Sequence, residues 1–446
     1  MKIKKADAAG SFYAADAHVL MGEISQLENA AQMQYACESR AVIVPHAALI
    51  YSGKLAARAM QHLHRGAKNI FIIAPAHSAA FDGIAVCDYE EFEIPLGTFH
   101  VNGTIVSALV DVFGCKVLSE AFSSEHAIEV QLPLLWSRFM GANIVPILVG
   151  DVDPKMVEKI VERFWRDREN VFIISSDLGH FHSGEEAEQF DAKTCRMIEN
   201  CECGEISHER ACGATAICGL LSFAEKMQFA PVRIGVYNSG AITGDCERVI
   251  GYGAWMLAEC MANRFVAENF RERVLSICNR SIECGLDGRN PSAAVDVPEV
   301  FSQYMSSFVT LTIGGHLRGC IGSIKAHRPL LSDLISNAHG AAFCDSRFPP
   351  LGAKEFKKIA VKVSLLSRPQ PIRFSGEREL LDAVVPNVDG IIISCGIFQA
   401  VYLPCVWEQI PDKNEFLASL KMKAGLPGDF FSECLQAHRF STECIG

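Results

Sequence analysis

The sequence predicts an α/β protein in two parts: an α/β domain over residues 1–262 with a largely parallel or mixed central sheet, and an α+β domain over residues 265–446. The first half alternates short apolar runs with helical periodicity, which is typical of buried strands joined by helices. Around residues 260–266 this alternation gives way to shorter strands mixed with helices. The length of 446 residues also exceeds that of one ordinary domain.

The elements of the first domain follow from periodicity and from local start and stop signals. Asp153 and Pro154 favour a helix start, because aspartate is a good N-cap and proline suits the first helical turn. The stretch from Glu125 to Met140 predicts a helix that Pro133 interrupts. Other expected helices cover 15–34 and 54–65, strands begin at Ala41 and Asn69, and further strands cover 143–149, 170–176, 231–238 and 248–257.

The second domain is expected to be α+β. A helical stretch from Arg264 to Cys284 leads into Gly-Leu-Asp-Gly-Arg-Asn-Pro at residues 285–291, which has the composition of a turn. Strands are expected over 307–313, 359–366, 389–395 and 399–403, and helices near 329–343 and 412–423.

Composition and charge restrict the classes of function. The formal net charge of -11 argues against non-specific binding to nucleic acid or to an anionic membrane, since both depend on basic patches. No apolar stretch approaches the roughly 18–20 residues that span a bilayer, and the N-terminus lacks the apolar core of a secretory signal. We therefore expect a cytoplasmic protein with neither a nucleic-acid nor a membrane partner.

The 18 cysteines include no C-x-x-C pair, which removes the main support for zinc-ribbon, thioredoxin-like and ferredoxin-like sites. Many lie in apolar runs, so we expect reduced thiols that pack as small hydrophobic groups.

Histidines follow three of the predicted strands. The runs that begin at Ala41, Asn69 and Asn170 lead to His46, His77 and His180. In open α/β sheets, ligands bind beyond the carboxyl ends of the strands. Neutral imidazole is also the commonest protein metal ligand. The pattern predicts a metal site or an acid–base site at this edge.

Two further residues fit the same site. Asp177 precedes His180 closely and offers a ligand or an acid–base partner, and His126 stands where a helix begins. An open-sided set of two histidines and a carboxylate is typical of non-haem Fe(II) oxygenases. The alternative interpretation is that these histidines are hydrogen-bonded structural residues.

Other polar residues of this half have simpler interpretations. We interpret His100 and His182 as surface or structural residues. The simplest interpretation of Glu125 and Glu129 is a helix-end charge and a solvated helix face.

The first 260 residues resemble the Memo family. The motifs that carry the resemblance are Ala9-Gly-Ser-Phe-Tyr13, Val44-Pro-His-Ala47, Tyr51-Ser-Gly53, Pro75-Ala-His77, Glu125-His-Ala-Ile-Glu-Val-Gln-Leu-Pro133, Ser175-Ser-Asp-Leu-Gly-His180, Ala211-Cys-Gly213 and Asn238-Ser-Gly240 with Gly251-Tyr252. The Memo fold is similar to that of class III (LigB-type) extradiol dioxygenases, which use non-haem Fe(II). The resemblance implies His46 and His77 as metal ligands, with Asp177, His180 and His126 lining the same pocket.

One position departs from the family pattern. Vertebrate Memo-like proteins have a cysteine as third ligand after the Asn/Gln-Ser-Gly/Ser motif. Counted from Asn238, that position is Ile242, which cannot bind a metal, and Cys246 lies four residues further on. Fe(II), another transition metal and no metal at all therefore stay open.

The densest motif of the second half is His316-Leu-Arg-Gly-Cys-Ile-Gly-Ser323. Arg318 could clamp an anion, Gly319 allows close backbone approach, and Cys320 could be a nucleophile. The alternative, which we favour, is a tight strand with an inert thiol.

The second half resembles the AMMECR1 domain. The resemblance rests on Leu317-Arg-Gly-Cys-Ile-Gly322, Asp345-Ser-Arg-Phe-Pro-Pro350, Val388-Asp-Gly390, Leu403-Pro404 with Val406-Trp-Glu-Gln409, and Leu420-Lys-Met-Lys-Ala-Gly-Leu-Pro427. Where many relatives have a glutamine, this sequence has Cys405. The combination is similar to the Memo–AMMECR1 proteins of the AmmeMemoRadiSam system, which implies a radical SAM protein as a separate partner.

Two functions compete at this point. The first is a non-haem-iron, oxygenase-like redox enzyme acting on an unknown small molecule, with His180 or His126 as acid–base groups. The second is a non-catalytic scaffold that binds a metal, a ligand or a peptide and works with the radical SAM partner.

Overall fold

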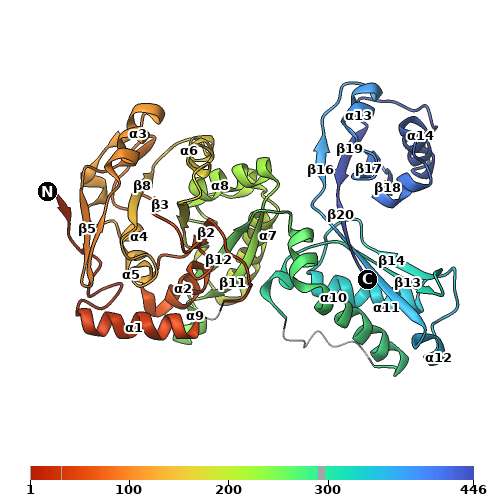
Figure 1. The fold of residues 1–446 in the computed structure, drawn as a ribbon, viewed down its shortest axis with the longest axis horizontal. Helices are drawn as coiled ribbons and strands as arrows, with labels where there is room; N and C mark the ends of the chain where they lie inside the picture. Colours follow the sequence, from red (N-terminus) through yellow and green to blue (C-terminus); the bar gives the residue numbers. More distant parts are fainter. Residues whose placement is uncertain (1, 32, 290–296) are drawn as a thin grey trace. The chain divides into compact units, whose positions relative to one another are not determined.

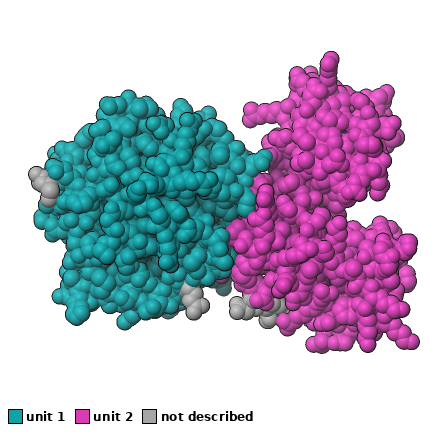
Figure 2. Space-filling model, viewed as in Figure 1, with its two compact units in different colours: residues 1–260 teal, residues 261–446 magenta. Residues whose placement is uncertain are grey.

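The computed structural model describes residues 2–31, 33–289 and 297–446. The chain forms two compact units, residues 1–260 and 261–446 (Figures 1 and 2). Each unit combines helices with mixed or antiparallel sheets, which confirms the predicted fold class.

Unit 1 is built around a mixed sheet whose order is β10-β12-β2-β9-β3-β8-β4-β7, with β11 paired to β12 (Figure 1). Its strands are β2 (Ala41–Val44), β3 (Asn69–Pro75), β4 (Ile84–Val86), β7 (Lys116–Val117), β8 (Asn143–Val149), β9 (Asn170–Ser175), β10 (His180–His182), β11 (Ala230–Asn238) and β12 (Val249–Ala258). The central strands β2, β9, β3 and β8 are parallel, whereas β12 runs antiparallel to β2. The carboxyl ends of β2, β9 and β3 therefore meet at one edge.

Helices pack against this sheet. The helices of unit 1 are α1 (Ala17–Ala30), η1 (Leu49–Gly53), α2 (Lys54–Met60), α3 (Gly103–Phe113), η2 (Ser119–Phe122), α4 (His126–Glu129), α5 (Leu132–Trp136), α6 (Lys155–Trp165), α7 (Gly184–Glu199), η3 (Cys203–Glu205), α8 (Ala214–Met227) and α9 (Gly240–Thr243). Among them, α2, α6, α7 and α8 contact strands of the sheet. A small sheet of β1 (Ile3–Lys4), β5 (Glu91–Ile94) and β6 (Gly97–His100) completes the unit.

Two helix predictions needed correction. The helix expected over 54–65 ends at Met60 and follows a π-helical turn. The single interrupted helix expected from Glu125 to Met140 is two short helices, with Pro133 in the first turn of α5, where proline needs no amide proton.

The core of unit 1 is closely packed against the sheet. Phe71 and Phe172 stack with ring centroids 4.8 Å apart, and α6 and α8 pack over them in the same buried cluster. Gly219 allows the two helices to approach, since a Cβ atom there would lie 2.4 Å from Val157 Cβ.

Unit 2 contains a long helix and two four-stranded sheets. The helix, α10 (Ala262–Leu286), is kinked at Phe270. One sheet has the order β14-β13-β15-β20 and the other β16-β19-β17-β18. Their strands are β13 (Ser307–Ile313), β14 (His316–Gly322), β15 (Ile359–Leu366), β16 (Gln370–Ile372), β17 (Gly390–Cys395), β18 (Phe398–Tyr402), β19 (Gln436–Phe440) and β20 (Thr442–Ile445).

The helices η4 (Glu299–Ser302), α11 (Leu330–Phe343), α12 (Ala353–Phe356), α13 (Glu377–Ala383), η5 (Pro404–Glu408) and α14 (Lys413–Lys423) complete unit 2. The predictions contained no β16, β19 or β20. The turn predicted over 285–291 lies partly outside the described residues. All eighteen cysteines are free thiols, and among the described residues no helix is long and apolar enough to cross a membrane.

Candidate metal centre

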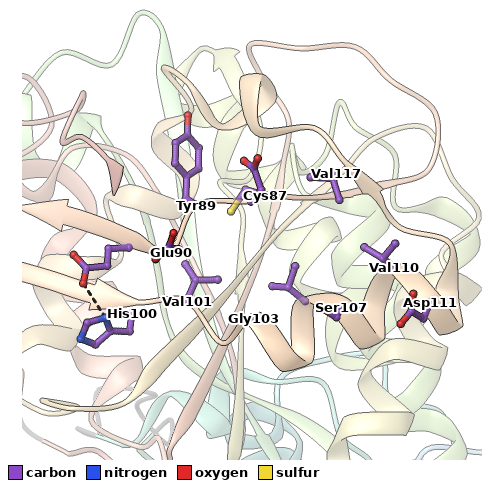
Figure 3. A pocket seen from close by; sticks show the side chains of 13 residues that line it. Cys87, Tyr89, Glu90, His100, Val101, Gly103, Ser107, Val110, Asp111 and Val117 are labelled. Carbon is purple, nitrogen blue, oxygen red and sulfur yellow. Dashed lines mark ion pairs between the residues drawn. The ribbon is translucent and has the colours of Figure 1, made fainter. Parts of the chain in front are cut away.

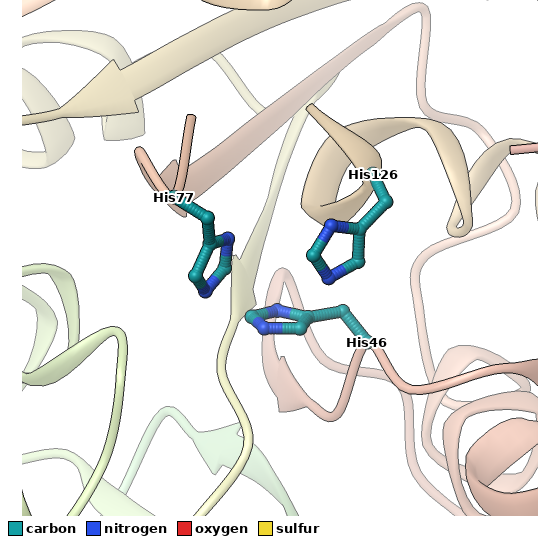
Figure 4. Close-up of side chains that lie close together, drawn as sticks. All are labelled: His46, His77 and His126. Atoms are coloured by element: carbon teal, nitrogen blue, oxygen red, sulfur yellow. The ribbon is translucent and has the colours of Figure 1, made fainter. Parts of the chain in front are cut away.

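Three imidazoles converge at the carboxyl edge of the central sheet. His46 and His77 each lie two residues beyond a parallel strand, β2 and β3, and His126 is the first residue of α4. One donor nitrogen from each ring lies within 4.8 Å of the other two. Figure 4 shows the three rings pointing into a common space. The fold therefore brings together both histidines implied as ligands and the helix-start histidine.

The hydrogen bonds of His46 fix its tautomer. Its Nδ1 lies 3.0 Å from Ser175 Oγ. That hydroxyl donates its proton to the carbonyl of Ala127 and accepts from Gln131 Nε2. His46 Nδ1 must therefore carry the proton, so Nε2 is unprotonated and its lone pair can accept a hydrogen bond or bind a metal.

Glu125 fixes His77 in the same way. Glu125 Oε1 lies 2.9 Å from His77 Nδ1, and Oε2 accepts the His77 backbone N–H at 2.6 Å. The carboxylate raises the pKa of His77, and the same interaction lowers the pKa of Glu125 against its burial. A carboxylate that holds Nδ1–H is the usual outer partner of a metal-binding histidine, so Nε2 of His77 is the available donor.

His126 is held by packing. Its ring stacks on Phe12, with centroids 4.4 Å apart, and on His77, with centroids 4.9 Å apart. Burial lowers the pKa of His126, and burial lowers that of His46 far more. Both rings are therefore neutral near neutral pH, the form that binds metals.

Asp177 and His180 lie beside this triad. Asp177 is buried, and its Oδ1 accepts the backbone N–H of His46 at 2.8 Å. Desolvation raises the pKa of this carboxyl to about 7. His180 is the first residue of β10, and burial together with the charge of His77 lowers its pKa. Both are placed as groups that could exchange a proton near neutral pH.

The triad opens into a cavity of about 610 Å³, within the range of small-molecule sites. All five residues predicted for this site line it. The remaining wall is largely aromatic and apolar, with Phe12, Tyr51, Phe181, Ile250 and Tyr252.

Comparison with protein families assigns both units. Residues 4–256 match the model of the Memo-like proteins. The chain belongs to the Memo family. Residues 275–445 match the AMMECR1 model, so this Memo-family chain carries an AMMECR1 domain as well.

Relatives of this Memo-family chain are found in archaea. It is 32% identical over 225 residues to a MEMO1 family protein of Metallosphaera sedula, covering 47% of this chain and 80% of the relative. It is 29% identical over 262 residues to one from Thermoplasma volcanium, covering 56% and 97%. A crystal structure of an uncharacterised protein from Pyrococcus horikoshii matches with a TM-score of 0.37 and 32% identity, covering 39% of this chain and 89% of that one.

Ile242, where vertebrate Memo-like proteins led us to expect a third ligand, offers no donor atom. Ile242 lies on α9 and is 49% exposed, and neither it nor Cys246 lines the cavity. The third imidazole of the described donor group is His126 instead.

Cys212 is a site residue that the sequence analysis missed. Its Sγ lies 3.3 Å from His46 Nε2 and accepts the Asp177 backbone N–H at 3.2 Å. Desolvation raises the pKa of this thiol to about 12, so it donates S–H to the bare His46 nitrogen. The residue stands in the motif Ala211-Cys-Gly213, but nothing in that motif indicates a contact with His46, which lies 166 residues away in the sequence. Only the folded edge of the sheet brings the two side chains together.

The interpretation of Glu125 as a helix-end charge was incomplete, and that of Glu129 as part of a solvated helix face was wrong. Glu125 does cap α4, accepting the Ala127 N–H, but it is buried and also holds His77. Glu129 is buried rather than solvated, and it binds Lys4 Nζ, the Ala8 N–H and the Tyr13 hydroxyl.

A second cavity of about 710 Å³ lies between α3 and the β5–β6 hairpin (Figure 3). None of the predicted site residues lines it. Its one histidine, His100, is exposed and pairs with Glu91 at 3.0 Å, as expected of a surface residue.

In unit 2 the Arg318–Cys320 motif forms β14. Arg318 donates from Nε and Nη2 to Glu355, at 2.9 and 3.0 Å, so an anion would have to compete with this carboxylate. A Cβ at Gly319 would lie 2.0 Å from the carbonyl oxygen of Ala341 in α11. The Cys320 thiol lies 3.2 Å from Thr310 Oγ1. These contacts favour the packing interpretation.

Proposed function

We propose that unit 1 is a non-haem-iron, oxygenase-like redox enzyme that acts on a small molecule. The observation that carries the proposal is the convergence of three imidazole donors within 4.8 Å of one another at the base of a cavity. Imidazole donors suit iron, copper, zinc and nickel, so Fe(II) is one of several candidates that the experiment must separate.

The donor set fits a metal. Hydrogen bonds from Nδ1 to Ser175 and Glu125 make Nε2 the remaining donor atom of His46 and of His77, and burial favours the neutral form of His126. Bound Fe(II) with open positions would supply oxygen activation. The protein would hold the ion with these three rings.

The remaining groups of the site handle protons and exclude water. Asp177 is buried, and with a pKa of about 7 its carboxyl can hold or release a proton under physiological conditions. His180 lines the same cavity, and its neutral ring can accept a proton there. The aromatic wall, including Phe12 and Tyr252, limits the access of water to the triad.

Metal content of the anaerobically purified full chain tests the proposal. We expect about one metal ion per chain, lost in the double variant His46→Ala/His77→Ala and retained in His100→Ala, whose ring is exposed. Equal, near-zero metal in all three proteins would exclude the metal centre. Bound metal without oxygen consumption toward any small molecule would instead support the scaffold alternative, which the donor-free Ile242 position favours.

We also propose that the protein belongs to the AmmeMemoRadiSam system and works with a radical SAM protein. The support is the presence of Memo and AMMECR1 matches in one chain. Co-purification of the full chain with the radical SAM protein encoded by the same organism tests this, and its absence under anaerobic conditions would count against the partnership.

A further inference from the structure

Phe181, at the rim of the triad cavity, has an unusual backbone conformation. In the pairing of β10 with β12, His180 lies opposite Ile250 and His182 opposite Val249, so Phe181 is the extra residue of a bulge. Its φ is 66°. A left-handed conformation at such a bulge normally belongs to glycine, because a bulky side chain there costs free energy.

Burial does not offset this strain. The Phe181 side chain is 61% exposed, although the residue lines the cavity. Strained residues that gain no stability from burial are found most often at ligand sites, where a bulge changes the direction of a side chain. The strain therefore indicates a role for this ring at the cavity rim.

Arg248 lies directly over that ring. Its guanidinium carbon is 4.8 Å from the Phe181 ring centroid, and Arg248 also lines the cavity. Within the part of the chain that the structure describes, no carboxylate lies within ion-pair distance of Arg248. The other charged rim residue, Asp245, turns its Oδ1 to the backbone N–H of Glu247, a local turn contact. Arg248 is thus an exposed cation at the mouth of the cavity, placed over the Phe181 ring.

We propose that the cavity binds a small molecule with a carboxylate group and an apolar, planar body. Arg248 pairs with the carboxylate, since a guanidinium offers a planar fork for it. Phe181 covers the apolar body against Phe12 and Tyr252 inside. This inference names the ligand class of the site in the proposed function and rests on that function for its biological meaning.

The test is calorimetric titration of the chelator-treated full chain with 3-phenylpropionate and with its uncharged amide, 3-phenylpropanamide. The acid is expected to bind at least about tenfold more tightly than the amide. Arg248→Gln should weaken binding of the acid about tenfold and leave the affinity for the amide unchanged. The matched control is Arg163→Gln, because Arg163 lies over Phe164 at 5.5 Å on α6, outside the cavity. Equal binding of acid and amide, no effect of Arg248→Gln, or no binding of the acid at millimolar concentration overturns the proposal.

Phe181→Gly separates a ligand role from a structural one. Glycine accepts a positive φ, so this variant should keep the melting temperature of the full chain. Its affinity for the acid should fall severalfold. Lower stability with unchanged affinity would show that the ring is structural, and this would overturn its assigned role. Repeating the titrations after metal addition distinguishes the two proposals: a chain that binds the acid but no metal retains the rim assignment and loses the metal centre.

Discussion

At the scale of single residues, Glu129 anchors the N-terminal segment that carries Phe12 to the three-histidine site. Its buried carboxylate accepts from Lys4 Nζ at 3.0 Å, and from the Ala8 N–H and the Tyr13 hydroxyl at 2.7 Å. Glu129→Gln leaves the buried Lys4 charge with Asp7 alone. We expect the free energy of unfolding to fall by about 2–4 kcal/mol, measured by urea denaturation followed by tryptophan fluorescence.

A surface pair provides the control for this substitution. Lys5 and Glu93 form an ion pair whose side chains are 68% and 39% exposed. Glu93→Gln should change stability by less than about 1 kcal/mol, because solvent screens such pairs. Equal losses in the two variants would contradict the anchoring role of Glu129.

Asp191 makes a pH-dependent contribution to stability. Desolvation raises its pKa to about 6 from an ordinary 3.8. The folded chain thus binds this proton more tightly than the unfolded chain, so the contribution is most favourable below pH 3.8 and is lost as the pH rises through about 6.

Asp191→Asn removes this titration and keeps an oxygen that can accept the Gly179 N–H. Relative to the unsubstituted chain, the variant should gain about 2 kcal/mol of unfolding free energy between pH 4 and pH 8. Denaturation midpoints collected across this range measure the difference. Parallel pH curves for the two proteins would show that Asp191 does not titrate differently on folding.

At the scale of elements, glycine decides how closely α6 and α8 approach. Gly219→Ala places a Cβ 2.4 Å from Val157 Cβ and 2.9 Å from the carbonyl oxygen of Pro154. We expect a loss of about 1–3 kcal/mol from overpacking, although alanine is the better helix former. Gly22→Ala in α1, where no atom lies within 4 Å of the new Cβ, should instead gain about 0.5–1 kcal/mol. Opposite signs in thermal unfolding would confirm the close approach.

In unit 2 a glycine likewise allows a close approach, here between β14 and α11. Gly319→Ala would drive a Cβ into the Ala341 carbonyl oxygen, 2.0 Å away, and should destabilise unit 2 by at least about 2 kcal/mol. Cys320→Ala removes only a partly exposed thiol and should cost less than about 1 kcal/mol. A growth or activity defect from Cys320→Ala in a stably folded chain would revive the nucleophile interpretation.

The sequence predicts elements well where periodicity is unambiguous. Strand β8 matches the prediction residue for residue, because a strand buried on both faces is a continuous apolar run. The short strands β16, β19 and β20 were missed, since a run of three to five residues with polar side chains has no distinctive period.

Some residues of the candidate site could be predicted from the sequence and others could not. His46 and His77 could be predicted because each follows a parallel strand, and the edge of such a sheet is a known ligand position. The buried roles of Glu125, Glu129 and Cys212 depend on which distant segments face them. Helical periodicity gives the burial of a residue only after the tertiary contacts are known.

At the scale of the whole molecule, a metal should protect one unit selectively. Binding to the folded triad at a hundredfold excess over Kd adds about 2.7 kcal/mol to the stability of unit 1. Hydrogen-exchange mass spectrometry of the full chain should show slower exchange in peptides of β2, β3 and α4, and unchanged exchange around Trp407 in unit 2. Uniform protection of both units, or of neither, would contradict a metal site confined to the triad.

The double role of Glu125 has a kinetic consequence. One carboxylate orients the His77 ring and caps the helix that begins with His126, so two of the three donors are set before any ion arrives. A site assembled in advance has little rearrangement to complete during binding. Metal uptake should then follow simple second-order kinetics, limited by the passage of the ion through the cavity. Exchange of one metal for another would be governed by how fast the first ion leaves.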